Sequence, residues 1–169
     1  MAARHRHDPS KSFVGFVVGD VSYAVSIHAV REISNPLDVV HLPRAPFSVV
    51  GVADYRGEVV PVVSLRQRFG LEGAAPGKAK WIILDADHDP VAVDLRAKGR
   101  PAHVALVVDQ VTEVFGNKGA GLKPSPELGG GERERGILGV TLRDGDLVFV
   151  LDPRAFRGML AAVQPRAEP

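Results

Sequence analysis

The sequence predicts a mainly β protein made of two tandem five-stranded β-barrels, with short helical segments and a helix at the C-terminus. Short runs rich in valine and isoleucine alternate along the chain with glycine-containing turns, as expected for strands joined by hairpins. Two stretches of the first half match two stretches of the second half in the same order, which indicates a repeated unit. Closure into barrels is expected because it protects edge strands from pairing with other chains.

The first half is organised around the stretch Phe47 to Phe69, in which Arg56-Gly57 marks a turn. The segment Glu58 to Leu65 behind this turn is rich in valine, whose branched side chain packs well in sheets. Pro61 lacks a backbone donor, so we expect it at a sheet edge or at a bulge. The stretch predicts a β-hairpin with a charged turn and no catalytic base or nucleophile, which favours a binding module over an enzyme.

Further short elements are expected around this hairpin. Phe13 to Val18 and Ser22 to Ile27 flank the turn Gly19-Asp20 and predict an earlier hairpin. His28 to Ile33 is expected to pass from a strand end into a helical turn. The run Ala102 to Val111 is long and largely apolar, as is typical of a strand buried on both faces. The remaining expected strands are Val39–Leu42, Trp81–Leu84, Val91–Leu95, Ile137–Leu142 and Leu147–Leu151, and the expected C-terminal helix is Ala155–Val163.

These elements predict a division of the chain at the segment Glu72 to Lys80, which is small, polar and rich in turn-forming residues. The expected parts are a disordered tail at 1–12, a first barrel at 13–71, a linker at 72–80, a second barrel at 81–152, and a C-terminal helix and tail at 153–169 that packs back on the first barrel.

The repeat consists of two matches that keep the same order along the chain. Gly51 to Arg66 can be laid over Gly139 to Arg154 without gaps, which matches glycines, valines and the final arginine. Tyr23 to Ile33 can be laid over Val104 to Val114, with apolar residues matching at most positions. The preferred interpretation is two related small barrels. The alternative is that any two hairpins with glycine turns look alike.

Composition is that of an ordinary globular protein, with 45% apolar and 24% charged residues among 169. The net charge of +1 gives no electrostatic case for nucleic acid, and aromatic side chains for base stacking are few. The lack of cysteine excludes disulfides and cysteine nucleophiles. No apolar segment has the character of a secretory signal or the length of a membrane span. We therefore expect a soluble, intracellular protein.

No catalytic motif was found: the sequence has no serine-hydrolase elbow, phosphate-binding loop or zinc-protease motif. The densest polar cluster is Asp85, Asp87, His88 and Asp89, whose oxygens could ligate a divalent cation. The glycine and downstream glutamate of an EF-hand-type loop are missing, so a solvated hairpin tip closed by Pro90 is the simpler interpretation. No catalytic residue, metal ligand or cofactor is assigned. A small-molecule or metal-binding β-barrel stays the alternative function.

Several motifs together resemble the CheW-like chemotaxis coupling proteins, over about residues 13 to 160. The most specific are Val-Arg-Glu-Ile at the end of Tyr23–Ile33 and Arg-Gly-x-Val-Val-Pro in the central hairpin. Pro-Arg-Ala-Pro-Phe (Pro43 to Phe47) precedes that hairpin, and Gly139 to Leu151 fits the second half of the family. The resemblance implies SH3-like barrels and a cytoplasmic, non-enzymatic adaptor without cofactor. Its partners would be methyl-accepting chemoreceptors and the regulatory domain of a CheA-type histidine kinase, at receptor arrays.

The resemblance also implies which residues contact the partners. The positions expected to bind the receptor, in the groove between the barrels, are Val30, Glu32, Ile33, Gly51, Asp54 and Arg56. The positions expected to bind the kinase are Trp81 and Val104, because the family presents apolar surface at the start of the second barrel. The alternative for Trp81, and equally for Val30 and Ile33, is an ordinary core residue.

Two features depart from the family pattern. The usual Asn-Leu-Arg-Gly of the hairpin turn is here Asp54-Tyr55-Arg56-Gly57, so the contact with the partner is expected to differ in charge. The segment Asp85 to Pro101 is longer than the tight hairpin of the family, and the additional residues could provide a contact or obstruct one.

Overall fold

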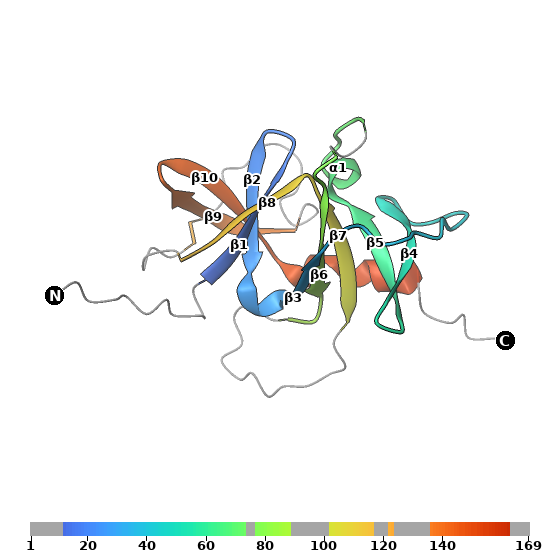
Figure 1. The fold of residues 1–169 in the computed structure, drawn as a ribbon. Coiled ribbons are helices and arrows are strands. Elements are labelled where there is room, and N and C mark those ends of the chain that lie inside the picture. The colour runs from blue at the N-terminus through green and yellow to red at the C-terminus, as the bar shows by residue number, and fades with distance from the viewer. Residues whose placement is uncertain (1–11, 74–76, 89–101, 117–121, 124–135, 163–169) are drawn as a thin grey trace.

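The valine-rich runs form strands in two sheets in the computed structural model, which describes residues 12–73, 77–88, 102–116, 122–123 and 136–162 (Figure 1). The strands are β1 (Ser12–Val18), β2 (Val21–Ser26), β3 (Val30–Ser34), β4 (Val49–Tyr55), β5 (Glu58–Ser64), β6 (Lys80–Asp85), β7 (His103–Val108), β8 (Gln110–Gly116), β9 (Ile137–Arg143) and β10 (Asp146–Leu151). The helical segments are the 3-10 helix η2 (Ile27–Ala29), the α-helix α1 (Leu65–Arg68) and the 3-10 helix η3 (Pro153–Ala162). The expected strand Val91–Leu95 lies outside the described residues.

Each sheet has five strands, which confirms the predicted mainly β class. Sheet A has the order β8-β1-β2-β10-β9, and sheet B has the order β3-β6-β7-β5-β4. Neighbouring strands are antiparallel except for two parallel pairs, β2 with β10 and β5 with β7. Each parallel pair joins a strand of the first half of the chain to a strand of the second half.

The two sheets are related by the repeat that the sequence indicates. Replacing β1 to β5 by β6 to β10, and the reverse, converts the strand order of sheet A into that of sheet B. The matched stretches fall on corresponding elements: one match covers β2–β3 and β7–β8, and the other covers β4–β5 and β9–β10. The similarity of the two hairpins therefore extends to a shared architecture.

The sheets do not follow the barrel boundaries expected at 13–71 and 81–152. Sheet A takes β1 and β2 from the first half and β8 to β10 from the second, while sheet B takes β3 to β5 and then β6 and β7. The chain changes sheet at η2 and again at Asp109, the single residue between β7 and β8. The segment expected as an interdomain linker instead joins α1 to β6, on the side of sheet B. The two repeats are thus interleaved instead of standing in tandem.

The central strands of each sheet bury both faces, as the sequence predicts for the run around β7. In β6, Ile82 and Leu84 belong to a large core shared by the two sheets, whereas Trp81 and Ile83 belong to a separate core inside sheet B. A third cluster fills sheet A and includes Phe13 and residues of β10. Because both faces are covered, the sequences of these strands are almost continuously apolar.

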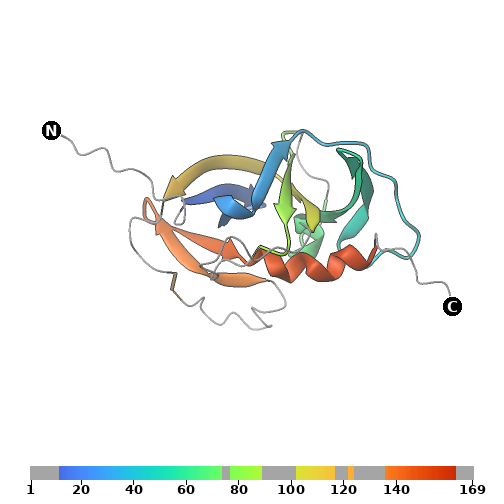
Figure 2. The same cartoon turned by 90° about the horizontal axis from the view of Figure 1, so that it is seen from below.

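The C-terminal helix predicted at Ala155–Val163 is the 3-10 helix η3. It leaves sheet A after β10 and lies against β5 and β7 of sheet B (Figure 2). Phe156 is fully buried in the shared core, and the guanidinium of Arg68 lies 4.9 Å from the centre of its ring. The helix therefore ties the two sheets together. No helix among the described residues is long and apolar enough to cross a membrane.

Candidate functional site

The end of the β4–β5 hairpin, residues 54–58, forms a tight turn that we call tip B. Arg56 has φ of 51° and Gly57 has φ of 83°, the left-handed pair expected in a two-residue hairpin loop. The backbone N–H of Gly57 donates to Oδ1 of Asp54 at 2.8 Å, which stabilises the turn. The turn projects the Arg56 side chain outward, and 75% of that side chain is exposed. The predicted hairpin and the exposure of Arg56 are both confirmed.

Glu32 connects the edge strand β3 to tip B. Its carboxylate lies 3.3 Å from the guanidinium of Arg56 and also accepts a hydrogen bond from the hydroxyl of Tyr55. The Arg56 guanidinium lies 5.5 Å from the centre of the Tyr55 ring, within cation–π range. Burial raises the pKa of Tyr55, and the hydrogen bond and charge of Glu32 raise it further. Since β3 and β4 are the outer strands of sheet B, these side chains close that sheet at its open edge.

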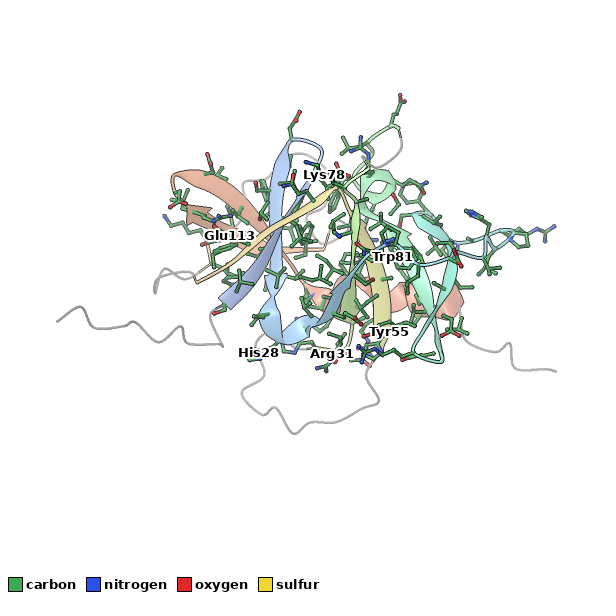
Figure 3. The ribbon with its side chains drawn as sticks, in the orientation of Figure 1. His28, Arg31, Tyr55, Lys78, Trp81 and Glu113 are labelled. Carbon is green, nitrogen blue, oxygen red and sulfur yellow. The ribbon has the colours of Figure 1, made fainter. Side chains whose placement is uncertain are left out.

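A hydrogen bond and an ion pair lie beside tip B. Glu58 lies 2.8 Å from Nδ1 of His103, whose ring packs edge-on against Tyr55 with 5.8 Å between the ring centres. Arg31 pairs with Asp85 at 3.1 Å. Figure 3 shows Arg31 and Tyr55 at the same end of the molecule, opposite Lys78. In each of the two contacts one side chain is largely buried and the other is about half-exposed, so the contacts hold the buried group in place at this end of the sheet.

The structure places the expected receptor-binding residues in three different settings. Glu32, Asp54 and Arg56 come together at tip B. Ile33 is 41% exposed on β3, whereas Val30 is half-buried and packs against the shared core. Gly51 is buried, and a Cβ there would lie 2.2 Å from the carbonyl oxygen of Val40. Gly51 therefore has a packing role and presents no side chain to a partner.

The residues expected to present apolar surface to the kinase are core residues, so the expected exposure is not observed. Trp81 is 3% exposed and packs inside sheet B with Tyr55 and Ile83. Val104 is fully buried in the core shared by the sheets. Both lie on central strands with two covered faces, which the apolar run alone cannot distinguish from a strand with one exposed face. Figure 3 shows Trp81 within sheet B.

The acidic cluster considered for a metal is engaged in other contacts. Asp85 accepts from the backbone N–H groups of Asp87 and Ala102 as well as from Arg31. Asp87 pairs with Arg157 of η3 at 2.8 Å. Asp89 lies outside the described residues, and the described residues contain no group of three or more potential metal ligands. The described part of the cluster thus serves to attach a turn to β3 and η3.

The sequence predicted a second hairpin at Ile137–Leu151, but the ion pair that closes its tip was not predicted. At the β9–β10 turn, which we call tip A (residues 142–146), Asp144 and Gly145 have φ of 49° and 86°. Glu113 of the edge strand β8 forms an ion pair with Arg143, whose guanidinium lies 5.1 Å from the centre of the Phe115 ring. The signal was present in the sequence, because the repeat pairs Glu32 with Glu113. At both tips, a glutamate of an edge strand thus pairs with an arginine of the hairpin.

Comparison with known proteins identifies the family. A family model described as a CheW-like domain matches residues 12–158. The chain is 28% identical over 151 residues to the chemotaxis protein CheW of Rhizobium meliloti (strain 1021), covering 89% of this chain and 90% of that protein. It is 31% identical over 115 residues to the chemotaxis protein CheW of Helicobacter pylori, covering 68% and 62% of the two chains.

A solved structure shares the fold. The scaffolding protein TtCheW from Thermoanaerobacter tengcongensis matches with a TM-score of 0.68 and 21% identity, covering 83% of this chain and 88% of that one. The two interleaved sheets are therefore an arrangement that a solved protein also adopts. Because the family model spans most of the sequence and the fold agrees, this chain belongs to the CheW-like domain family.

Proposed function

We propose that this protein is a non-enzymatic adaptor that couples the cytoplasmic tips of chemoreceptors to a CheA-type histidine kinase. The observation that carries the proposal is the ordered arrangement at tip B. Glu32 of β3 pairs with Arg56, and the next residue of β3, Ile33, is exposed. Family membership supports it, because the relatives are named as chemotaxis proteins and the structural neighbour as a scaffolding protein.

The receptor is assigned to tip B. The cytoplasmic end of a chemoreceptor is a helical hairpin, and one face of a helix can cover the exposed side chain of Ile33 and the accessible part of Val30. Arg56 retains donors for a carboxylate or for the carbonyl groups at a helix end. Because Glu32 already orders Arg56, less side-chain entropy is lost when the receptor binds.

The kinase is assigned to tip A and its surroundings. Val114, Leu142 and Leu147 each expose more than half of their surface there, which is unusual for aliphatic residues. The regulatory domain of the kinase is built from the same paired barrels, so an apolar barrel end offers it a matching contact. Contacts through such small apolar surfaces are expected to be transient. Their dissociation constants should lie near the micromolar range, which corresponds to a binding free energy of about −8 kcal/mol.

Two separate tips explain how one small protein can couple two partners. Tip A belongs to sheet A and tip B belongs to sheet B, and the shared core and η3 hold the two sheets in a fixed relation. A receptor on one tip and a kinase on the other are then held at a defined distance. This role places the protein in the cytoplasm at receptor arrays, and it requires no cofactor, nucleic acid or membrane insertion.

Isothermal titration calorimetry with two partners tests the proposal. The protein is titrated with a receptor-tip fragment and, separately, with the kinase regulatory domain, as the wild type and as the Ile33→Asp, Arg56→Glu and Leu147→Asp variants. We expect the first two variants to weaken receptor binding at least tenfold and to leave kinase binding within twofold. Leu147→Asp should do the reverse, so each variant controls for the folding of the other. Failure of the folded wild type to bind either partner would disprove the adaptor function.

A further inference from the structure

The outer face of the β4–β5 hairpin carries a small patch of aliphatic side chains around one carboxylate. Val40 pairs with Val52 of β4, and Asp54 pairs with Val59 of β5, so these four side chains share one face of the sheet. Val40 is 64% exposed and Val59 is 55% exposed. We call these four residues the Asp54 patch. Exposed aliphatic residues grouped on an ordered sheet face are typical of a contact surface.

Asp54 has no cationic partner among the described residues. Oδ1 of Asp54 accepts a hydrogen bond from the backbone N–H of Gly57. The neighbouring Arg56 is turned towards Glu32, and the carboxylate of Glu58 is turned towards His103. The carboxylate of Asp54 is therefore left exposed beside Val59 with its charge uncompensated.

The wider tip has more negative than positive charge. Glu32, Asp54, Glu58 and Asp85 provide four carboxylates there, against the two guanidinium groups of Arg31 and Arg56. Tyr55 lies on the buried side of the tip, where burial, the hydrogen bond to Glu32 and the charges of Glu32 and Glu58 raise its pKa, while the charge of Arg56 lowers it. A partner with acidic residues at the same place would be repelled, while a basic one would be attracted.

We propose that the helix which docks on tip B carries a lysine or arginine among aliphatic residues, and that this cation pairs with Asp54. The inference rests on the proposed function, since it names the chemistry of the receptor surface. The aliphatic stem of a lysine or arginine can lie along Val40 and Val59 while its charged end reaches the carboxylate. Exclusion of water by the surrounding valines strengthens the pair relative to one in open solvent.

The test is the titration of a chemoreceptor cytoplasmic-tip fragment from the same organism into the wild type and Asp54→Asn at low and high salt. The amide oxygen of asparagine can still accept from Gly57, so the turn is kept while the charge is lost. Asp146→Asn is the matched control, because it removes another exposed carboxylate, at tip A. At low salt we expect Asp54→Asn to weaken binding about fivefold and Asp146→Asn to leave it within about twofold. At high salt the charges are screened, so the affinities of the wild type and Asp54→Asn for the fragment should become nearly equal.

A charge exchange identifies the partner residue. Asp54→Lys should bind the wild-type fragment more weakly than Asp54→Asn does, and replacing one lysine or arginine of the fragment by glutamate should restore binding to Asp54→Lys at least threefold. Equal binding of the wild type and Asp54→Asn would overturn the proposed charge pair and leave the adaptor function intact. Failure of the wild type to bind the fragment at all would overturn both.

Discussion

At the residue scale, glycine at two repeat-related positions allows a neighbouring segment to pass close to a strand. Val40 forms a bridge with Val52 and lies against Gly51. Lys123 likewise forms a bridge with Val140 and lies against Gly139. A Cβ on Gly139 would lie 2.9 Å from the carbonyl oxygen of Lys123, a close approach but a milder one than the 2.2 Å at Gly51. The sequence identified both glycines through the repeat. It could not show that the first of them acts through packing, because the pairing of Val40 with Val52 has no local signal in the sequence.

Replacing Gly51 by alanine is expected to destabilise the fold by about 2 kcal/mol, since the new methyl group would meet backbone atoms of Val40 that cannot move aside cheaply. Urea unfolding followed by circular dichroism measures the change. Gly158→Ala is the control, because a Cβ at Gly158 meets nothing within 4 Å. If both variants unfold at the same urea concentration, the close approach at Gly51 has no energetic importance. Any loss of partner binding by Gly51→Ala would then need another cause.

At the element scale, the important feature is the junction at which β7 ends and β8 begins in the other sheet. The sequence predicts one continuous apolar strand over Ala102 to Val111, and the two-sided burial of that run is observed. The break at Asp109 was not predicted, because one acidic residue in a long apolar run carries no local signal of a change of sheet. Its meaning comes from contacts that are distant in sequence. Asp109 accepts from the backbone N–H of Gly19 at 2.7 Å and pairs with Arg66 at 2.5 Å.

Loss of the Asp109 carboxylate is expected to cost about 3 kcal/mol of folding free energy, because the largely buried guanidinium of Arg66 would lose its counter-charge. Chemical denaturation of Asp109→Ala measures this cost. Asp87→Ala is the control, since its pair with Arg157 is exposed and should contribute less than about 1 kcal/mol. The double variant Arg66→Met/Asp109→Leu should recover part of the loss, because it leaves no buried charge unpaired. A single variant as stable as the control would show that the junction does not depend on this pair.

At the scale of the whole molecule, the strand order shows that each sheet is built from strands of both repeats. The repeat in the sequence correctly showed that the halves are built alike, and local patterns located most hairpins. The same repeat also made the strand pairing ambiguous, because β1–β2 and β6–β7 are equivalent units. From the sequence, either unit could join β3–β5 or β8–β10 in a sheet. The parallel pairs β2–β10 and β5–β7 decide the matter, and no local signal encodes them. The division at residues 72–80 separates β1–β5 from β6–β10, and each sheet takes strands from both sides of it.

Interleaving has a consequence for fragments of the chain. If each half formed its own barrel, residues 1–76 and residues 77–169 would each fold alone. In the observed topology each half lacks strands of both sheets, and the shared core is divided between the halves. We expect each purified fragment to lack cooperative thermal unfolding in circular dichroism. An equimolar mixture should regain the strand signal and a cooperative transition, because the two halves together supply both sheets.

The mixture also tests function at the same scale. Tip B combines Glu32 and Arg56 of the first fragment with His103 of the second, so receptor binding should return only when both fragments are present. The full-length Arg56→Glu variant is the control for specific binding. Cooperative unfolding of residues 77–169 alone would contradict the interleaved topology. A mixture that refolds but does not bind the receptor would instead place the receptor contact away from tip B.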